Sequence, residues 1–500
     1  MKKIMIVGGG TAGWMSALIM ARDWIAKGVQ IELVESPDVG IIGVGEGSTP
    51  ALKTFFDVLD IPEAEWMPEC NATYKCGITF DKWSTRSGYE SYFHPFSAAL
   101  DRQTLPIFMH NAQARLRGAD LYAHPDRFFI AARVARGCLA PVAPEHFPFE
   151  MAYGYHFDAV LLGQFLRKKA IARGVVHRVC HIAQVQQDDA GNIAALVTDS
   201  AEVCTADFFV DCSGFAGLLL QNTLKTPFVS FSNNLLNDAA VAMPSDIGEK
   251  IPSETISTAL KHGWSWRIPL TNRFGNGYVY SSAFCLADEA EYELRERLGL
   301  LDADIPVRHL KMKIGRAQAH WVKNCLAVGL AQGFIEPLEA TALFFVQQTA
   351  AIFVELFNKG EFTDRYRNEF NQRINDHFDG IRDYIVTHYK TSSRTDTEYW
   401  RANTADQQDI SPTMHELYAA WMAGKDLVAE VQRLKIAGYY AAPSWYCILT
   451  GMGILPNAQQ VRKPTQEDAR HDLAALDNFL RRCTLNFPDH RRYLEALATP

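Results

Sequence analysis

Residues 4–35 read IMIVGGGTAGWMSALIMARDWIAKGVQIELVE, a sequence that predicts a strand, a glycine-rich turn, a helix and a second strand. The turn contains the pattern Gly-x-Gly-x-x-Gly. Gly8 allows a tight turn, Gly10 lets the backbone approach a pyrophosphate, and Gly13 lets the helix pack closely against the strand. The segment therefore predicts a βαβ unit that binds a dinucleotide, and with it an α/β fold.

The residues around this turn strengthen that prediction. Thr11 and Ala12 open the helix, where unpaired backbone N–H groups face the phosphates of a bound nucleotide. Glu35 ends the second strand, where a carboxylate can accept a hydrogen bond from the adenosine ribose. A glycine-rich turn of purely structural function is the alternative. The strand, helix and terminal glutamate around the glycines favour nucleotide binding.

Composition excludes several classes of function. The 500 residues are 48% hydrophobic, enough to bury a large core and to form two or three domains or subdomains. The 49 basic and 57 acidic residues give a net charge of −8, so charge offers no argument for binding nucleic acid or an anionic membrane. The ten cysteines form no CxxC pair, and no zinc-like spacing of cysteine and histidine occurs. We therefore predict no metal and reduced thiols.

The N-terminus resembles a secretory signal, because Lys2 and Lys3 precede uncharged residues up to Ala21. Three consecutive glycines interrupt any apolar helix there, and the nucleotide-binding turn explains the same residues better. No other stretch approaches the roughly 20 apolar residues that a membrane-spanning helix requires. A cytoplasmic protein without membrane contact is the expectation.

Three further stretches contain glycine where backbone could lie close to a cofactor. Residues 40–50 include Gly45 and Glu46 and suit backbone that lies close to a planar ligand, an ordinary loop being the alternative. Residues 208–214 and 325–331 each run from an apolar strand into a glycine turn. We interpret them as parts of one discontinuous nucleotide-binding domain.

We place this domain within residues 1–350, interrupted at about 60–155 and 225–310 by segments that carry the substrate side. Residues 351–500 are predicted to form a mainly helical C-terminal subdomain that covers the substrate pocket. Because no second complete glycine pattern occurs, no separate NAD(P)H-binding domain is expected.

Local signals predict several elements. Asp158 caps a helix that Gly174 closes, strands follow at 175–185 and 193–198, and a further helix occupies 51–59. Pro337 opens a helix over 338–358 whose first turn contains Glu339. The backbone amides of Thr341 and Ala342 could hold a small anion there, although a first-turn glutamate also complements the helix dipole.

Two polar–aromatic stretches are candidates for a pocket. In residues 71–96 aromatic and polar side chains alternate, and Lys75 lies between Tyr74 and Cys76. A solvated strand lysine is the plainer interpretation of Lys75 alone. Likewise, Trp264 and Trp266 alone would be a packing pair.

The order of these motifs along the chain resembles the flavin-dependent halogenases of the tryptophan halogenase family. Residues 263–269, GWSWRIP, match the pattern WxWxIP of that family. Eight further blocks follow the family's order over some 450 residues: GGGTAGW, GVGEGSTP, ATYKCGITF, HFDAVLLGQFL, DCSGFAGLL, FIEPLEATALFF, HYKTSSRTDTEYW and WYCILTGMGILP. The resemblance implies a Rossmann-like FAD-binding domain of the flavin monooxygenase type with substrate-domain insertions.

The resemblance also implies the chemistry. FADH2, supplied by a separate flavin reductase, reacts with O2 to give a flavin hydroperoxide, which halide (chloride or bromide) converts to hypohalous acid. This oxidant passes through a tunnel to Lys75, which holds or activates it for halogenation of a small aromatic substrate. Glu339 orients the oxidant and accepts a proton. No nucleic acid partner is implied, and the oligomeric state stays open, a homodimer or other homo-oligomer included.

Further residues take their expected roles from the same resemblance. Thr341 and Ala342 correspond to the halide site, and the motif residues Trp264, Trp266, Ile268 and Pro269 are structural. His94, Phe96 and Trp445 contact the substrate. The cofactor-binding set is Gly8, Gly10, Thr11, Ala12, Gly13, Glu35, Gly45, Glu46, Ile182, Leu330 and Leu343.

The chain departs from the family at two sites. The family block Glu-Ser-Thr-Gly reads Glu339-Ala340-Thr341-Ala342 here, which could alter halide preference, for example towards bromide. Residues 434–445, LKIAGYYAAPSW, lack the acidic and aromatic run that grips the amino acid in the family. We therefore expect an atypical member without the tryptophan-binding lid, acting on indole or another electron-rich arene.

Three alternatives remain open. The first is a classical halogenase of free L-tryptophan, which differs only in substrate. The second is a flavin-dependent aromatic monooxygenase, which needs neither Lys75 nor a halide site. The third is a non-catalytic flavin-binding or scaffold protein.

Overall fold

The computed structural model describes residues 2–38, 40, 45–405 and 410–499. Residues 41–44 of the predicted glycine loop therefore lie outside the described part of the chain. The chain divides into two compact units, each built from three segments. The first comprises Met1–Ala72, Phe157–Ser232 and Met312–Asp379, and the second comprises Thr73–His156, Asn233–Lys311 and Gly380–Pro500.

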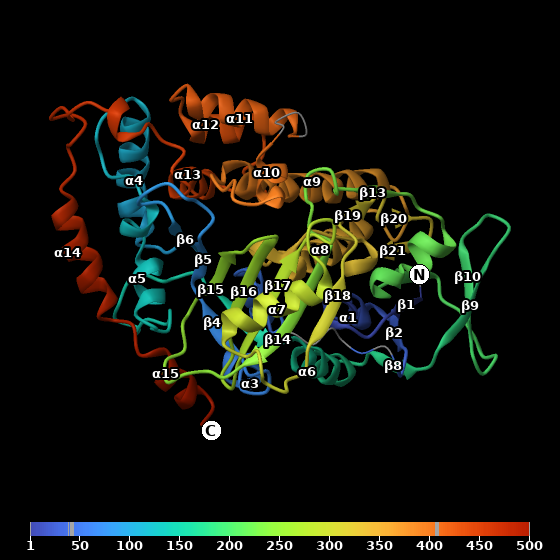
Figure 1. Cartoon of the computed structure of the whole chain (residues 1–500). Helices are drawn as coiled ribbons and strands as arrows, with labels where there is room; N and C mark the ends of the chain where they lie inside the picture. The colour runs from blue at the N-terminus through green and yellow to red at the C-terminus, as the bar shows by residue number, and fades with distance from the viewer. Residues whose placement is uncertain (1, 39, 41–44, 406–409, 500) are drawn as a thin grey trace. The chain divides into compact units, whose positions relative to one another are not determined.

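The first unit contains a six-stranded sheet in the order β20-β21-β12-β1-β2-β8 (Figure 1). Its strands β21, β12, β1, β2 and β8 are parallel to their neighbours, and β20 pairs antiparallel with β21. The bounds are β1 Lys3–Val7, β2 Gln30–Glu35, β8 Val176–Val179, β12 Phe208–Asp211, β20 Trp321–Val322 and β21 Cys325–Ala327. The α/β fold class predicted from the sequence is confirmed.

Smaller elements complete this unit. Helices α1 and α8 contact each other, and so do α1 and α6. A hairpin of β9 and β10 extends from the sheet, with β11 beside β10 (Figure 1). The remaining bounds are α1 Thr11–Trp24, β3 Gly45–Gly47, α2 Ala51–Val58, α3 Glu63–Trp66, α6 Ala159–Ala172, β9 Ile182–Gln187, β10 Ile193–Thr198, β11 Val203–Cys204, β13 Phe228–Ser230, β19 Gly315–Ala317, β22 Gly333–Phe334 and α8 Ala342–Lys359.

The local predictions for this unit fit the observed elements with two corrections. The single strand predicted over 175–185 is two strands, β8 and β9, which belong to different sheets. The Asp158 carboxylate caps α6 by accepting hydrogen bonds from the N–H groups of Val160 and Leu161. The predicted helix over 338–358 is wrong at its start, because a 3-10 turn covers Pro337–Glu339 and α8 begins only at Ala342. Between them Ala340 has φ +56°, a left-handed conformation that cannot continue a right-handed helix.

The second unit is built on a seven-stranded sheet in the order β18-β14-β17-β16-β15-β5-β6. All neighbours are antiparallel except β15 and β5, and helix α7 lies across one face of the sheet (Figure 1). The bounds are β5 Gly77–Asp81, β6 Ser91–Pro95, β14 Ala239–Ser245, β15 Thr255–Ala259, β16 Gly263–Pro269, β17 Phe274–Tyr280, α7 Ala287–Leu298 and β18 Arg308–Lys311.

Helices surround this sheet within the same unit. Strand β4 precedes β5 and pairs with β7, which ends at the boundary between the units. Helix α9 likewise begins in the first unit and ends in the second. The bounds are β4 Thr73–Lys75, α4 Asp101–Leu116, α5 Ile130–Arg136, β7 Gly154–Asp158, α9 Arg367–Thr391, α10 Glu398–Thr404, α11 Pro412–Met422, α12 Leu427–Arg433, α13 Ala442–Gly451, α14 Leu473–Thr484 and α15 His490–Leu497. No helix in the described ranges is both long and apolar enough to cross a membrane.

Strand β17 accommodates the WxWxIP motif through a glycine. Gly277 lies directly opposite Trp266, and a Cβ at Gly277 would come within 2.1 Å of the Trp266 ring. The two indole rings of Trp264 and Trp266 pack with their centroids 6.2 Å apart, and both side chains are buried. Trp266 can therefore lie across the neighbouring strand only because position 277 has no side chain.

We predict that Gly277→Ala lowers the free energy of unfolding by about 1–3 kcal/mol, because the added methyl group overpacks the sheet and displaces Trp266. Urea denaturation followed by tryptophan fluorescence measures the effect. Gly248→Ala is the control, since no heavy atom lies within 4 Å of a Cβ at that position. Equal stability of the two variants would contradict the packing argument.

Candidate active site

The predicted nucleotide turn in the first unit has the geometry that a pyrophosphate requires. Gly8 has φ +117°, and its N–H donates to the Val34 carbonyl at 2.8 Å. A Cβ at Gly10 would meet no heavy atom within 4 Å, whereas a Cβ at Gly13 would lie 1.9 Å from the Gly8 carbonyl oxygen. At Gly13 the helix therefore packs directly against the turn, with no room for a side chain, whereas the space beside Gly10 is free of other atoms. That open side is where a phosphate can approach the start of α1, which has no side-chain cap.

Glu35, at the end of β2, is held by partners that the sequence did not reveal. Its Oε1 accepts a hydrogen bond from His177 Nε2 at 2.6 Å, and Arg167 Nη1 lies 3.6 Å away. Strand β8 runs parallel to β2 and brings His177 alongside. A histidine and an arginine more than 130 residues away leave no local signal around Glu35. They orient the carboxylate predicted to bind ribose.

The carboxyl ends of β1, β12 and β21 bring further predicted cofactor residues together. A Cβ at Gly329 would lie 2.7 Å from the Ala12 Cβ and 3.8 Å from Val346. This places the turn containing Leu330 and the start of α8, with Leu343, beside the first turn of α1. The backbone carbonyl of Glu35 accepts a hydrogen bond from the N–H of Cys180 at 3.0 Å. Ile182, another predicted cofactor residue, follows Cys180 by two residues.

Gly45 and Glu46 form the start of β3 in the same unit. Burial, and secondarily the charge of Asp158, raise the pKa of Glu46 to about 7. Together with the open cradle at Gly10, these residues fit a bound dinucleotide such as FAD. The fit rests on the shape of the turn and on the oriented Glu35 carboxylate.

The predicted halide residues lie at the start of α8. Thr341 is the N-cap residue and provides no side-chain hydrogen bond to the helix, so the first backbone N–H groups of α8 remain available to an anion. Glu339 and Thr341 are both buried. Within this block the unusual backbone conformation is at Ala340, which has φ +56°, whereas Ala342 has entered the helix.

In the second unit, Lys75 is fully buried at the end of β4. Its Nζ lies 5.5 Å from the centroid of the Phe96 ring, a cation–π distance. The plainer interpretation of Lys75 as a solvated strand residue is therefore wrong. The structure brings together Lys75 and Phe96, two of the predicted site residues.

An aromatic cluster surrounds His94 in the same unit. The Tyr384 hydroxyl lies 3.4 Å from His94 Nε2 and donates to the Ser444 carbonyl at 3.1 Å. Tyr384 stacks on Tyr440 with centroids 3.5 Å apart, and Trp445 packs edge-on against Tyr384. His94 and Trp445 are thus joined through Tyr384, which sequence reasoning missed. Tyr384 was hard to find because it lies on α9 without any surrounding motif.

The WxWxIP motif connects to the strand that carries Lys75. The Thr73 hydroxyl donates a 2.7 Å hydrogen bond to the Pro269 carbonyl. Ile268 and Pro269 end β16, and Ile268 is buried. This hydrogen bond attaches β4 to the end of β16, so we interpret the motif as a structural element.

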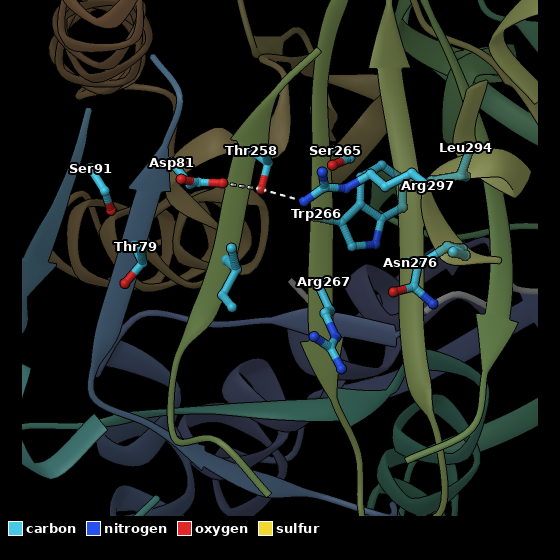
Figure 2. Close-up of a pocket in the computed structure, with 12 residues that line it drawn as sticks. Thr79, Asp81, Ser91, Thr258, Ser265, Trp266, Arg267, Asn276, Leu294 and Arg297 are labelled. Carbon is cyan, nitrogen blue, oxygen red and sulfur yellow. Dashed lines mark hydrogen bonds between the residues drawn. The ribbon is translucent and has the colours of Figure 1, made fainter. Parts of the chain in front are cut away.

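A cavity of about 250 Å³ opens between α7 and strands β5, β15, β16 and β17 (Figure 2). Arg297 donates to the Thr258 hydroxyl, which donates to Asp81. Of the predicted site residues only Trp266 borders this cavity, and Lys75, His94, Phe96 and Trp445 do not. It is distinct from the cluster around Lys75.

Comparison with known proteins agrees with these assignments of fold. The family model for tryptophan halogenase matches residues 3–467. The chain is 35% identical to the 7-chloro-L-tryptophan 6-halogenase KtzR of Kutzneria sp. (strain 744), over 98% of each chain.

Two solved structures are similar over almost the whole chain. One is the tryptophan 6-halogenase SttH from Streptomyces toxytricini, at 33% identity and a TM-score of 0.85, covering 99% of this chain and 100% of that one. The other is the flavin-dependent halogenase BrvH from Brevundimonas sp. BAL3, at 29% identity and a TM-score of 0.83, covering 99% of each chain.

We predict that Gly10→Ala weakens FAD binding at least about tenfold, because a methyl group would occupy the space through which the pyrophosphate approaches the backbone. Titration of the protein with FAD, followed by flavin fluorescence, measures the dissociation constant. The melting temperature should stay close to that of the wild type, since nothing lies near the added carbon. Unchanged FAD affinity in Gly10→Ala would contradict the assignment.

Proposed function

The chain belongs to the tryptophan halogenase family and is a flavin-dependent halogenase, and on this premise we propose that Lys75 delivers oxidised halogen to an indole or another electron-rich arene. The observation that carries the proposal is the burial of the Lys75 amine beside Phe96. An enclosed amine next to an aromatic wall is suited to transfer of an electrophile.

The first unit would hold the flavin through the turn at Gly8, Gly10 and Gly13 and through Glu35. When bound, reduced FAD would supply two electrons to O2, and the resulting peroxide-level oxygen would oxidise the halide to hypohalous acid, leaving oxidised FAD and water. The family uses a flavin, and a separate flavin reductase is the partner that it implies. The N–H groups at the start of α8, at Thr341 and Ala342, would hold chloride or bromide.

Lys75 has two possible roles with hypohalous acid. Its ammonium can donate a hydrogen bond to the oxygen and so polarise the O–X bond. Alternatively, the neutral amine can take up the halogen and release water, forming a haloamine. In both routes a ring carbon of the substrate gains the halogen and loses a proton.

Glu339 is the proposed acceptor of that ring proton. Glu339 belongs to the first unit and Lys75 to the second. Passage of the oxidant to Lys75 through an internal tunnel therefore stays a prediction from the family resemblance.

The substrate proposal rests on the segment that follows α12. Residues 434–445 contain one charged side chain, Lys435, and no carboxylate that could bind an ammonium group. Tyr384, Tyr440 and Trp445 form an aromatic cluster there instead. These features favour an arene without an amino acid side chain. KtzR and SttH, by their names, act on tryptophan or a chlorotryptophan, so free L-tryptophan is the alternative substrate.

We predict that Lys75→Ala loses halogenation by on the order of 10²- to 10⁴-fold while oxidising reduced FAD at the wild-type rate. Product is measured by mass spectrometry and flavin oxidation by absorbance, with a flavin reductase and bromide present. Lys261→Ala, at an exposed lysine of the same unit, is the control. Product formation retained in Lys75→Ala would refute the role of Lys75, and an oxygenated product would favour the monooxygenase alternative.

The substrate prediction needs a separate comparison. Indole and L-tryptophan are offered at equal concentration, once with chloride and once with bromide. We expect indole to be halogenated faster, because the site lacks a carboxylate partner for the tryptophan ammonium group. Much faster conversion of tryptophan would show that the substrate assignment is wrong.

A further inference from the structure

Strand β4 carries Lys75, and among the described residues β7 is the one strand that pairs with it. It pairs with β7 through Thr73 opposite His156 and Lys75 opposite Gly154, and it ends its sheet. An edge strand leaves alternate backbone N–H groups directed away from its partner. The outward N–H of Tyr74, immediately before Lys75, needs another acceptor.

His490 supplies that acceptor from the first position of α15. Its Nε2 accepts a hydrogen bond from Tyr74 N–H at 3.1 Å, and its Nδ1 lies 3.0 Å from the Ile251 carbonyl. A backbone amide can only donate and a carbonyl can only accept, so Nδ1 carries the proton and Nε2 is bare. Burial lowers the pKa of His490 to about 4, which keeps the ring neutral.

His156 holds the same strand from its paired side. The Thr73 hydroxyl donates its single proton to the Pro269 carbonyl, so it must accept at 3.1 Å from His156 Nδ1. His156 Nε2 then accepts from the Thr255 hydroxyl at 2.9 Å. Burial, followed by the positive charge of Lys75, lowers the pKa of His156 well below its ordinary value.

Helix α15 is itself anchored next to β4. His490 N–H donates to the Cys138 carbonyl at 2.9 Å, and the Arg491 guanidinium donates to the carbonyls of Glu249 and Gly248 at 2.6 and 2.7 Å. The rings of His490 and Tyr493 both lie 5.9 Å from the Tyr74 ring. The imidazole of His490 therefore occupies a defined place beside the strand.

We propose that His490 and His156 are positioning residues that hold Lys75 in place as a pair of neutral imidazoles, His490 through the Tyr74 backbone and His156 through the Thr73 side chain. We call this pair the histidine clamp. The inference rests on the proposed function, in which Lys75 transfers the halogen. His490 lies beyond residues 3–467, the range that the family model matches.

The clamp matters because halogen transfer depends on the position of one amine. Displacing a reacting group by about 1 Å can cost on the order of a hundredfold in rate. Loss of the Tyr74 hydrogen bond would loosen β4 on the N-terminal side of Lys75, so that Lys75 would be held on its outward side only by the next bond along, from Cys76 N–H to the Ser253 carbonyl at 2.7 Å. Because both rings are neutral, they hold the strand without placing a second positive charge next to the Lys75 amine.

The test compares His490→Leu with His490→Gln. Leucine removes the acceptor, whereas the Gln Oε1 can take the place of Nε2. We expect His490→Leu to lose protection of the Tyr74 amide in hydrogen–deuterium exchange and to yield on the order of ten- to a hundredfold less halogenated product per reduced FAD consumed. In His490→Gln both quantities should stay within about threefold of the wild type, with the substrate KM unchanged in both variants.

His146→Leu, at an exposed histidine of the same unit, is the matched control. Wild-type protection of the Tyr74 amide in His490→Leu, or lost protection with unchanged product yield per flavin, would overturn the proposal. Equal losses in the Leu and Gln variants would overturn it too, since they would indicate packing alone.

A second pair of variants keeps the proposal testable if His490→Leu does not fold. Thr255→Val removes the hydrogen bond to His156 Nε2, and Thr258→Val changes a buried threonine of the same strand that does not contact His156. Only Thr255→Val should lower the product yield per flavin, and equal yields would overturn the proposal. Amide exchange is measured without flavin or halide, so it tests the clamp even if Lys75→Ala shows that the proposed function is wrong.

Discussion

The parallel pairing of β1 with β12 on one side and β2 on the other is the constraint on which the first unit depends. The pairing aligns Val7 with both Asp211 and Val34, so the three strands end at the same edge of the sheet. Gly8 can turn away there because the Val34 carbonyl accepts its N–H and because φ +117° is open to glycine. The opening above Gly10 and the position of Glu35 follow from this shared edge.

In the second unit the main constraint is the burial of the Lys75 amine. Removing an amine from water is costly, and like charges nearby would add to that cost. The structure places the Phe96 ring beside the Lys75 amine, and the nearby His156 has a pKa that burial and the Lys75 charge hold well below its ordinary value. The strand that contains the WxWxIP motif also helps to hold Lys75. The Pro269 carbonyl at the end of the motif accepts a hydrogen bond from the Thr73 hydroxyl, two residues before Lys75. The motif is therefore connected to the lysine through its proline and not through its two indole rings.

The features predictable from sequence were those with local causes. The glycine pattern predicted the first turn, and Asp158 predicted the start of α6, because turns and helix caps depend on neighbouring residues. The start of α8 was misjudged because no residue type announces that Ala340 adopts positive φ. The roles of Lys75 and Phe96 came from family resemblance. The partners of Glu35 and of Tyr74 could not be predicted, since His177 and His490 lie 142 and 416 residues away in sequence.

The interleaving of the two units has a consequence for synthesis on the ribosome. β1 is made at the outset, yet β12 and β21, which complete its sheet, emerge only after more than 200 and more than 320 residues. The first segment of the second unit is translated before β12, and its second segment is translated before β21. The apolar strand β1 therefore lacks two of its sheet neighbours while most of the chain is made, and such non-local strand pairing is intrinsically slow and exposed to aggregation.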